Sequence, residues 1–228
     1  LTLGSVPMTE ASRTPGDPLV AAAVALFDEQ GYERTSVDDI ARAGGLSRST
    51  FFRQYGGKDD VVFADHDVAI AALRELLETT DETPWRAVCD AALAAFDHFA
   101  ADVELARRRY RVVRGVPALR DREIVMVFRY ERLFGDHLRA RLPELDAAEL
   151  VGFSAAVTAV HNHVLRRLLR GDDTVTRLTV HAALDDLLRR FGVHPDGEPP
   201  ADEDVVVAVF PRRMPLAEVT RRIRSELS

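Results

Sequence analysis

The chain has 228 residues, 46% of them hydrophobic, so it can bury one or two packed cores. Cys89 is its only cysteine, which excludes an intrachain disulfide framework and a thiolate metal cluster and favours a reducing cytoplasm. A net charge of −7 argues against non-specific coating of nucleic acid, which requires Lys and Arg to neutralise phosphates. Apolar runs are shorter than the roughly 20 residues that span a bilayer, so no membrane partner is expected.

Helical periodicity dominates the sequence and predicts an all-α fold with about nine helices. We expect four regions, in chain order: a flexible N-terminal arm (1–16), a three-helix helix-turn-helix head (17–60), a larger helical domain for effector binding and dimerisation (61–192), and a linker with a C-terminal tail (193–228).

The head is expected to begin with a helix at Asp17-Pro18, because Asp supplies a cap oxygen and Pro fits the first helical position. Gly31 ends this helix. A second, short helix is expected from Ser36 to Ala43, and its first residues resemble a capping box with Asp in place of the usual Glu.

A glycine turn at Gly44-Gly45 closes the second helix, and Ser47 can cap a third one. Within the third helix, Phe51 and Tyr55 are four residues apart and are expected to face a small core. The pattern therefore predicts two short helices that meet at a tight turn.

The segment from Arg42 to Lys58 contains four basic residues and no acidic one. A helix that enters the major groove needs a polar N-terminal edge, a rigid apolar back and flanking phosphate anchors, and this segment offers all three. We predict that Arg48 and Ser49 contact bases, since an Arg–guanine pair discriminates by roughly 1–3 kcal/mol. Ser36 and Thr50 lie near helix N-termini, where hydroxyls suit phosphate oxygens.

The stretch 31–58, GYERTSVDDIARAGGLSRSTFFRQYGGK, resembles the DNA-binding signature of TetR-family transcriptional regulators almost position for position. The resemblance covers the three helices of the head and the start of a fourth, while the rest of the chain matches only in helix number and length. It implies a homodimer, a two-fold operator in double-stranded DNA, and an effector pocket in the larger domain.

Single positions follow or depart from the family pattern. The resemblance implies that Lys58, at the start of a long fourth helix, binds a phosphate. Phe52 stands where the family usually has a phosphate-binding tyrosine, so we expect it to pack only on sugar or methyl groups. Gln54 replaces a common histidine and can still donate to a phosphate. Asp38 lies where some members have a basic contact, and we expect it to serve its helix N-terminus instead.

The larger domain is predicted to contain six long helices: Lys58–Thr79, Trp85–Ala100, Leu105–Arg114, Arg120–Leu142, Ala147–Arg170 and Thr174–Phe191. Aromatic residues that either line a pocket or fill the core are Trp85, Phe96, Phe99, Tyr110, Phe128, Tyr130 and Phe153. No single ligand contact is assigned. The aliphatic, arginine-bearing composition suits a small hydrophobic effector, either an acyl chain, including acyl-CoA, or an aromatic compound.

The last two long helices carry apolar faces, with Val157, Val160, Val164 and Leu168 on the first and Leu184, Leu187 and Leu188 on the second. The family resemblance implies that these helices pack against their mates as a four-helix dimer interface.

Other patterns give weaker signals. His161 and His163 are two residues apart, which does not match the four-residue spacing of a helical metal pair, so no metal site is expected. Ser154, His161 and Asp185 are scattered, and with no phosphate-binding loop neither catalysis nor a cofactor is expected. The basic run at 107–111 is either a solvated helix face or a second anion-binding patch.

The tail contains an apolar run from Val205 to Phe210 and an amphipathic stretch from Leu216 to Leu227. It either docks as a strand and a helix or forms a partly ordered extension. The sequence as a whole predicts a repressor that a small hydrophobic effector releases from its operator. The alternative is a helical dimer that binds a ligand or a protein and has lost its reading of DNA.

Overall fold

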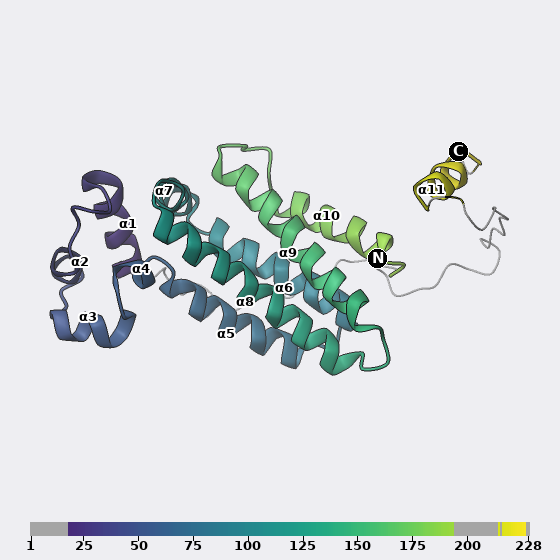
Figure 1. The fold of residues 1–228 in the computed structure, drawn as a ribbon, viewed down its shortest axis with the longest axis horizontal. Helices are drawn as coiled ribbons and strands as arrows, with labels where there is room; N and C mark the ends of the chain where they lie inside the picture. Colours follow the sequence, from purple (N-terminus) through teal and green to yellow (C-terminus); the bar gives the residue numbers. More distant parts are fainter. Residues whose placement is uncertain (1–17, 194–213, 215, 227–228) are drawn as a thin grey trace, which may run out of the picture. The chain divides into compact units, whose positions relative to one another are not determined.

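The computed structural model describes residues 18–193, 214 and 216–226. Every regular element in these residues is an α-helix, which confirms the predicted all-α fold (Figure 1). The chain divides into two compact units, one ending at Pro195 and the other beginning at Asp196. The first unit contains α1 (Pro18–Gln30), α2 (Val37–Ala43), α3 (Arg48–Tyr55), α4 (Lys58–Val61), α5 (Ala64–Thr79), α6 (Pro84–Ala100), α7 (Val103–Gly115), α8 (Pro117–Arg141), α9 (Ala147–Leu169) and α10 (Arg177–Arg190).

The predicted long helix from Lys58 to Thr79 is wrong, because the chain forms two helices there, α4 and α5. Between them, Phe63 has non-helical backbone angles of φ −115° and ψ 11°. The three consecutive residues Val61, Val62 and Phe63 are all buried, at 0%, 0% and 5% exposure. All three side chains belong to the head core, and α5 begins only after them, at Ala64.

The caps predicted for the head are present. Ser36 and Asp39 form a reciprocal capping box at the start of α2, and the Ser47 side chain accepts from the Thr50 amide at the start of α3. Gly31 ends α1 with a φ of +86°, a region that suits glycine. The proposed cap at Asp17 lies outside the described residues.

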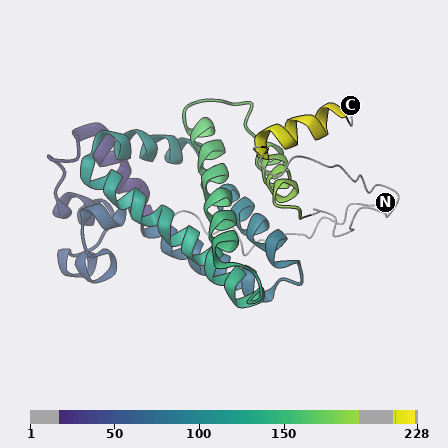
Figure 2. The same cartoon turned by 45° about the vertical axis from the view of Figure 1, so that its right-hand side comes forward.

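Two apolar clusters hold the first unit together. The head core joins the buried side chains of α1 to α4 with Val112 and Val113 of α7 and Leu119 of α8. The main core joins α5, α6, α8, α9 and α10. Helix α7 packs against α1, and α5 and α8 run side by side away from the head (Figure 1 and Figure 2). The larger domain therefore supplies part of the head core.

The apolar faces predicted for dimerisation mostly belong to the main core. The residues buried within the protomer are Val157, Val164, Leu168, Leu184, Leu187 and Leu188. They are buried because α9 packs against α6 and α8 while α10 packs against α6 and α9. The outward surfaces of these helices instead expose Val151 on α9 and Leu178 on α10, at 48% and 76%.

The second unit contains α11 (Leu216–Glu226), which agrees with the amphipathic stretch predicted there. Glu218 accepts from Arg222 across one turn of this helix, at 3.3 Å, and also pairs with Arg221. The apolar run from Val205 to Phe210 lies outside the described residues. No helix in the described part of the chain is long and apolar enough to cross a membrane. The same residues contain no group of three His, Cys, Asp or Glu side chains that could hold a metal ion.

Candidate nucleic-acid interface and ligand cavity

Helix α3 has one buried side and one exposed side. Phe51 is fully buried in the head core and stacks near Tyr55, with ring centroids 5.5 Å apart. The exposed side chains are Arg48, Ser49, Phe52, Arg53 and Gln54. Five of the seven predicted DNA contacts therefore lie on α3, four of them exposed, and the short α2 packs against this helix.

Arg48, the predicted base contact, is paired with an acid from the neighbouring helix. Its Nη1 donates to both carboxylate oxygens of Asp38 at 2.9 Å, and its guanidinium lies 5.3 Å from the ring centroid of Phe52. Both partners of the ion pair are exposed, so its net stabilisation is small, about 0–1 kcal/mol. A guanine edge could therefore replace Asp38 at modest cost.

The predicted phosphate anchors Ser36 and Thr50 differ in whether their hydroxyl protons are already used in hydrogen bonds. The Ser36 hydroxyl donates to Asp39 at 2.6 Å, so its proton is occupied by the capping box. Hydrogen bonds from the side chain and backbone of Ser36 also hold the pKa of Asp39 below its usual value. The Thr50 hydroxyl accepts from Ser47 at 2.9 Å, which leaves its own proton available for a phosphate.

Lys58 is held by Tyr32, a residue that the sequence interpretation missed. Lys58 Nζ donates to the Tyr32 carbonyl at 3.1 Å and lies 3.9 Å from the centroid of the Tyr32 ring. The Tyr32 hydroxyl donates to Asp59, and burial together with that carboxylate raises the pKa of Tyr32. The spacing of 26 residues gives no local signal for this contact, which the fold creates.

Two of the four basic residues between Arg42 and Lys58 are paired with acidic residues in the structure. Asp38 pairs with Arg48, and Asp39 pairs with Arg42 at 3.1 Å. Arg53, also exposed on α3, forms no ion pair among the described residues. Arg53 is therefore a further candidate phosphate contact that the sequence interpretation did not select.

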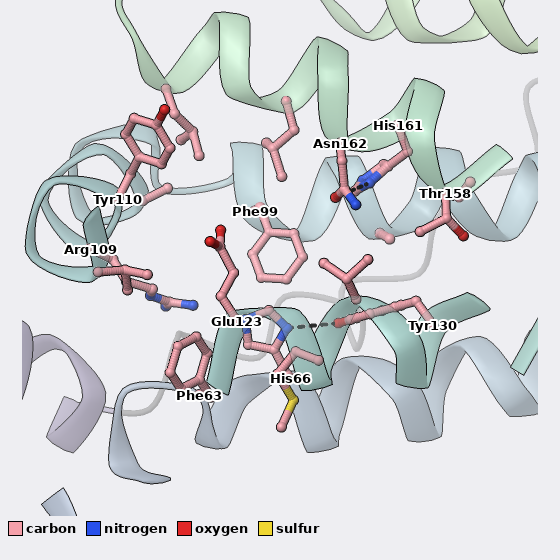
Figure 3. A pocket seen from close by; sticks show the side chains of 18 of the residues that line it. Phe63, His66, Phe99, Arg109, Tyr110, Glu123, Tyr130, Thr158, His161 and Asn162 are labelled. Carbon is pink, nitrogen blue, oxygen red and sulfur yellow. Dashed lines mark hydrogen bonds between the residues drawn. The ribbon is translucent and has the colours of Figure 1, made fainter. Parts of the chain in front are cut away.

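A cavity of about 100 Å³ lies inside the larger domain, lined mainly by apolar side chains of α5 to α9 (Figure 3). Of the aromatic residues named as candidates, Phe99, Tyr110 and Tyr130 line it. Those in the main core instead are Trp85, Phe96 and Phe153. Phe128 does neither, because it is 61% exposed on the outer side of α8.

A buried ion pair stands at one wall of the cavity. Arg109 of α7 donates to both carboxylate oxygens of Asp65 on α5, at 3.0 and 2.5 Å, and both side chains are 10% exposed. Burial raises the pKa of Asp65, but the charge and hydrogen bonds of Arg109, together with His66 and His98, outweigh burial and hold the pKa below its usual value. The pair ties α7, which packs on the head, to the first turn of α5.

Two histidines line the cavity in neutral form. His66 Nδ1 lies 3.1 Å from the Tyr130 hydroxyl, and burial lowers the pKa of His66 to about 3. His161 Nδ1 lies 3.4 Å from Asn162 Oδ1, while its Nε2 is buried with no hydrogen-bond partner. Burial lowers the pKa of His161 to about 4. The cavity therefore presents uncharged imidazoles at neutral pH.

The described geometry agrees with comparisons to known proteins. Residues 19–64 match the family of bacterial regulatory proteins called the tetR family. A proposed mycofactocin biosynthesis transcriptional regulator of Mycobacterium tuberculosis, MftR, is 37% identical over 106 residues, which are 46% of this chain and 54% of that protein. The transcriptional regulator TcmR of Streptomyces glaucescens is 35% identical over 81 residues, 35% of this chain and 36% of that protein.

Similarity thus spans about half, or less, of the length of these two relatives. Among solved structures, the fatty acid degradation regulator FadR from Bacillus halodurans superposes with a TM-score of 0.56 at 18% identity. That match covers 75% of this chain and 97% of the other, and it shows a shared fold. The head of the chain, at residues 19–64, is therefore the part that matches the tetR family of bacterial regulatory proteins.

Proposed function

We propose that this protein is a ligand-responsive transcriptional repressor that binds a two-fold operator as a homodimer in the bacterial cytoplasm. The exposed polar edge of α3, within a head that matches the family over residues 19–64, carries the proposal. Arg48 and Ser49 would read bases, with Phe52 packed against sugar or methyl groups. The phosphate anchors would be Thr50, Gln54, Lys58 and the capped N-terminus at Ser36, joined by Arg53.

The cavity and the head share wall residues, which supports control by a ligand. Phe63 and Val113 both belong to the head core and both line the cavity. A ligand that fills the cavity must contact these side chains, and it can therefore stabilise one position of the head over another. Release from DNA requires only that the ligand bind the two positions with different affinity.

The outward sides of α9 and α10 support a homodimer. Val151 and Leu178 are exposed there, and the small residues Ala159 and Ala182 are exposed on the same two helices. Small side chains allow helices to approach closely, as a four-helix interface requires. In a dimer, the two α3 helices would meet half-sites about one DNA turn or more apart.

Binding to the DNA upstream of its own gene, measured at several salt concentrations, tests the repressor function. We expect sequence-dependent binding whose affinity falls steeply with salt. Replacement of Arg48 by Ala should cost about 1–3 kcal/mol and relax the preference at one base pair of each half-site. Arg74→Ala, which removes an exposed arginine of α5, is the matched control and should bind as the unmodified protein does. Equal affinity for unrelated DNA would refute the proposal.

The alternative function, a ligand- or protein-binding dimer that no longer reads DNA, is favoured by one observation. Asp38 occupies the guanidinium of Arg48, so a negative charge lies at the edge that must approach phosphates. The same experiment separates the two functions, because this alternative predicts weak binding with no sequence preference at low salt.

A further inference from the structure

Glu123 places an unpaired carboxylate in the wall of the cavity. It lies on α8, and its side chain points into the space between Phe99 and Arg109 (Figure 3). Among the described residues it has no hydrogen bond or ion pair, and it is the only acidic side chain in the cavity lining. The side chain is half-exposed, so water can reach its carboxylate, and a ligand that displaces this water must pair with the charge.

The positive charge in the same wall is already matched. Arg109 is the only basic residue in the described lining apart from the neutral histidines. Asp65 neutralises its charge through hydrogen bonds from Nη1 and Nη2, while its Nε is buried without a hydrogen-bond partner. Two further arginines, Arg114 and Arg170, donate to the Tyr110 hydroxyl, but both are exposed to solvent. The charge left unmatched inside the cavity is therefore the negative charge of Glu123.

His161 adds a second free acceptor. When its Nδ1–H donates to Asn162 Oδ1, the opposite nitrogen, Nε2, carries a lone pair, and that atom is buried without a partner. The neighbouring Thr158 hydroxyl cannot supply a proton, because it donates to the Ser154 carbonyl at 2.8 Å. A buried acceptor without a donor costs stability, so a ligand N–H or O–H would be favoured here.

Aromatic rings complete the site. Phe63, Phe99 and Tyr110 line the same space as Glu123. The faces of aromatic rings attract cations, and this attraction is stronger where water is excluded. Apolar walls, aromatic faces and an unmatched carboxylate together suit a hydrophobic cation.

We propose that the effector is a hydrophobic amine, with an aromatic or aliphatic body in the cavity and a protonated nitrogen paired with Glu123. This inference rests on the proposed ligand-responsive function and narrows its ligand class. It disfavours the acyl chain expected from composition, because a carboxylate headgroup would meet the like charge of Glu123 in a site of low dielectric.

Calorimetry with three probes of one shape tests the ligand class. Phenylbutylamine, phenylbutanol and phenylbutyrate differ only in a cationic, neutral or anionic end group at about pH 7.5. We expect the full-length protein to bind the amine about tenfold or more tightly than the alcohol, and the acid most weakly. An acid that binds as tightly as the amine, or no binding of any probe, would overturn the proposal. This ranking needs no variant.

Glu123→Gln provides the site-specific test. It should weaken binding of the amine about tenfold or more and change binding of the alcohol by less than about twofold. The matched control is Glu131→Gln, which removes the same charge from α8 at a half-exposed position outside the cavity lining. Equal losses for amine and alcohol, or the same loss in the control, would contradict the assignment.

The failure of this inference and that of the proposed function can be told apart. Calorimetry uses no DNA, so it reports on the cavity even if the head binds no operator. Amine binding that leaves an operator complex intact would uphold the ligand class and reject its role as effector. Operator binding without amine binding would support the repressor function and reject the ligand class.

Discussion

Arg48 shows how a single DNA-reading residue depends on its neighbours. Its position at the exposed start of α3 follows from the capped helix around Ser47. Its pairing with Asp38 does not follow from local sequence, because Asp38 is 10 residues away and meets Arg48 only through the packing of α2 against α3. The ion pair holds the guanidinium in place and also reduces its charge.

Asp38→Asn should raise the affinity for operator DNA about threefold to tenfold, because it frees Arg48 and removes an anion near the phosphates. The gain should shrink as salt increases. Binding by fluorescence anisotropy, at low and moderate salt, measures both effects. Asp136→Asn, which removes another exposed, Arg-paired carboxylate from α8, should leave the affinity unchanged. Weaker binding by Asp38→Asn would mean that Asp38 positions Arg48 productively.

His161 gives the protein a pH-dependent stability. Its pKa falls from 6.5 to about 4 on folding, so between these values the unfolded chain binds a proton that the folded chain does not. The free energy of unfolding is therefore unaffected by this group above pH 6.5. It falls as the pH decreases toward 4, by up to about 1.4 kcal/mol per pH unit.

Urea unfolding between these pH values tests this prediction. His161→Gln should show a shallower loss of unfolding free energy with acid than the unmodified protein does. His163→Gln, at an exposed site on the same helix, is the control and should keep the original slope. An unchanged slope in His161→Gln would show that other groups cause the acid sensitivity.

At the scale of elements, the turn between α2 and α3 needs two glycines for different reasons. A Cβ at Gly44 would lie 2.1 Å from Leu19 Cδ1, so this position is limited by packing. Gly45 has open space around it but a φ of +67°, so it is limited by its backbone conformation. The paired glycines in the sequence indicate the turn, while the structure separates their roles.

Gly45→Ala should lower the unfolding free energy by about 1 kcal/mol, because an L-residue with a side chain is strained at positive φ. Gly45→Asn should cost less, since Asn tolerates this conformation better than Ala does. Thermal unfolding followed by circular dichroism measures the difference. Equal stability of the Ala variant and the unmodified protein would show that the turn adopts another conformation.

The break between α4 and α5 illustrates where helical periodicity is insufficient. Val61, Val62 and Phe63 continue a run of residues that could form a helix, yet the helix breaks there and all three side chains pack into the head core. The consequence is functional. Phe63 lies at the break and belongs both to the head core and to the cavity lining, so in the proposed repressor the connection from ligand to DNA would pass through this break and not through one continuous helix.

In the whole molecule, the Arg109–Asp65 pair joins the helix that supports the head to the helix that lines the cavity. Asp65→Asn should lower the unfolding free energy by about 3–5 kcal/mol, because it leaves a buried guanidinium without a counter-ion. Replacing both residues by Leu should recover most of this loss. Urea unfolding of the single and double variants measures these changes in unfolding free energy. A loss below about 1 kcal/mol in Asp65→Asn would contradict the prediction.

The amino-acid sequence by itself determined the elements whose causes are local. Helical periodicity, caps at Ser36 and Ser47, and the glycine turn depend on residues within a few positions of one another, so the head could be predicted in detail. The exposed side of α3 followed from the same periodicity.

Only the tertiary structure decided which distant residues meet. Periodicity shows that α9 and α10 have apolar faces, but it cannot distinguish a face that packs within its own protomer from one that packs against a partner. Most of the predicted dimer residues proved to be core. Likewise, the partners of Arg48, Lys58 and Arg109 depend on how helices pack. The unmatched charge of Glu123 becomes evident only when five helices line one cavity, because ion pairing depends on the positions of residues in space and not on their separation in the sequence.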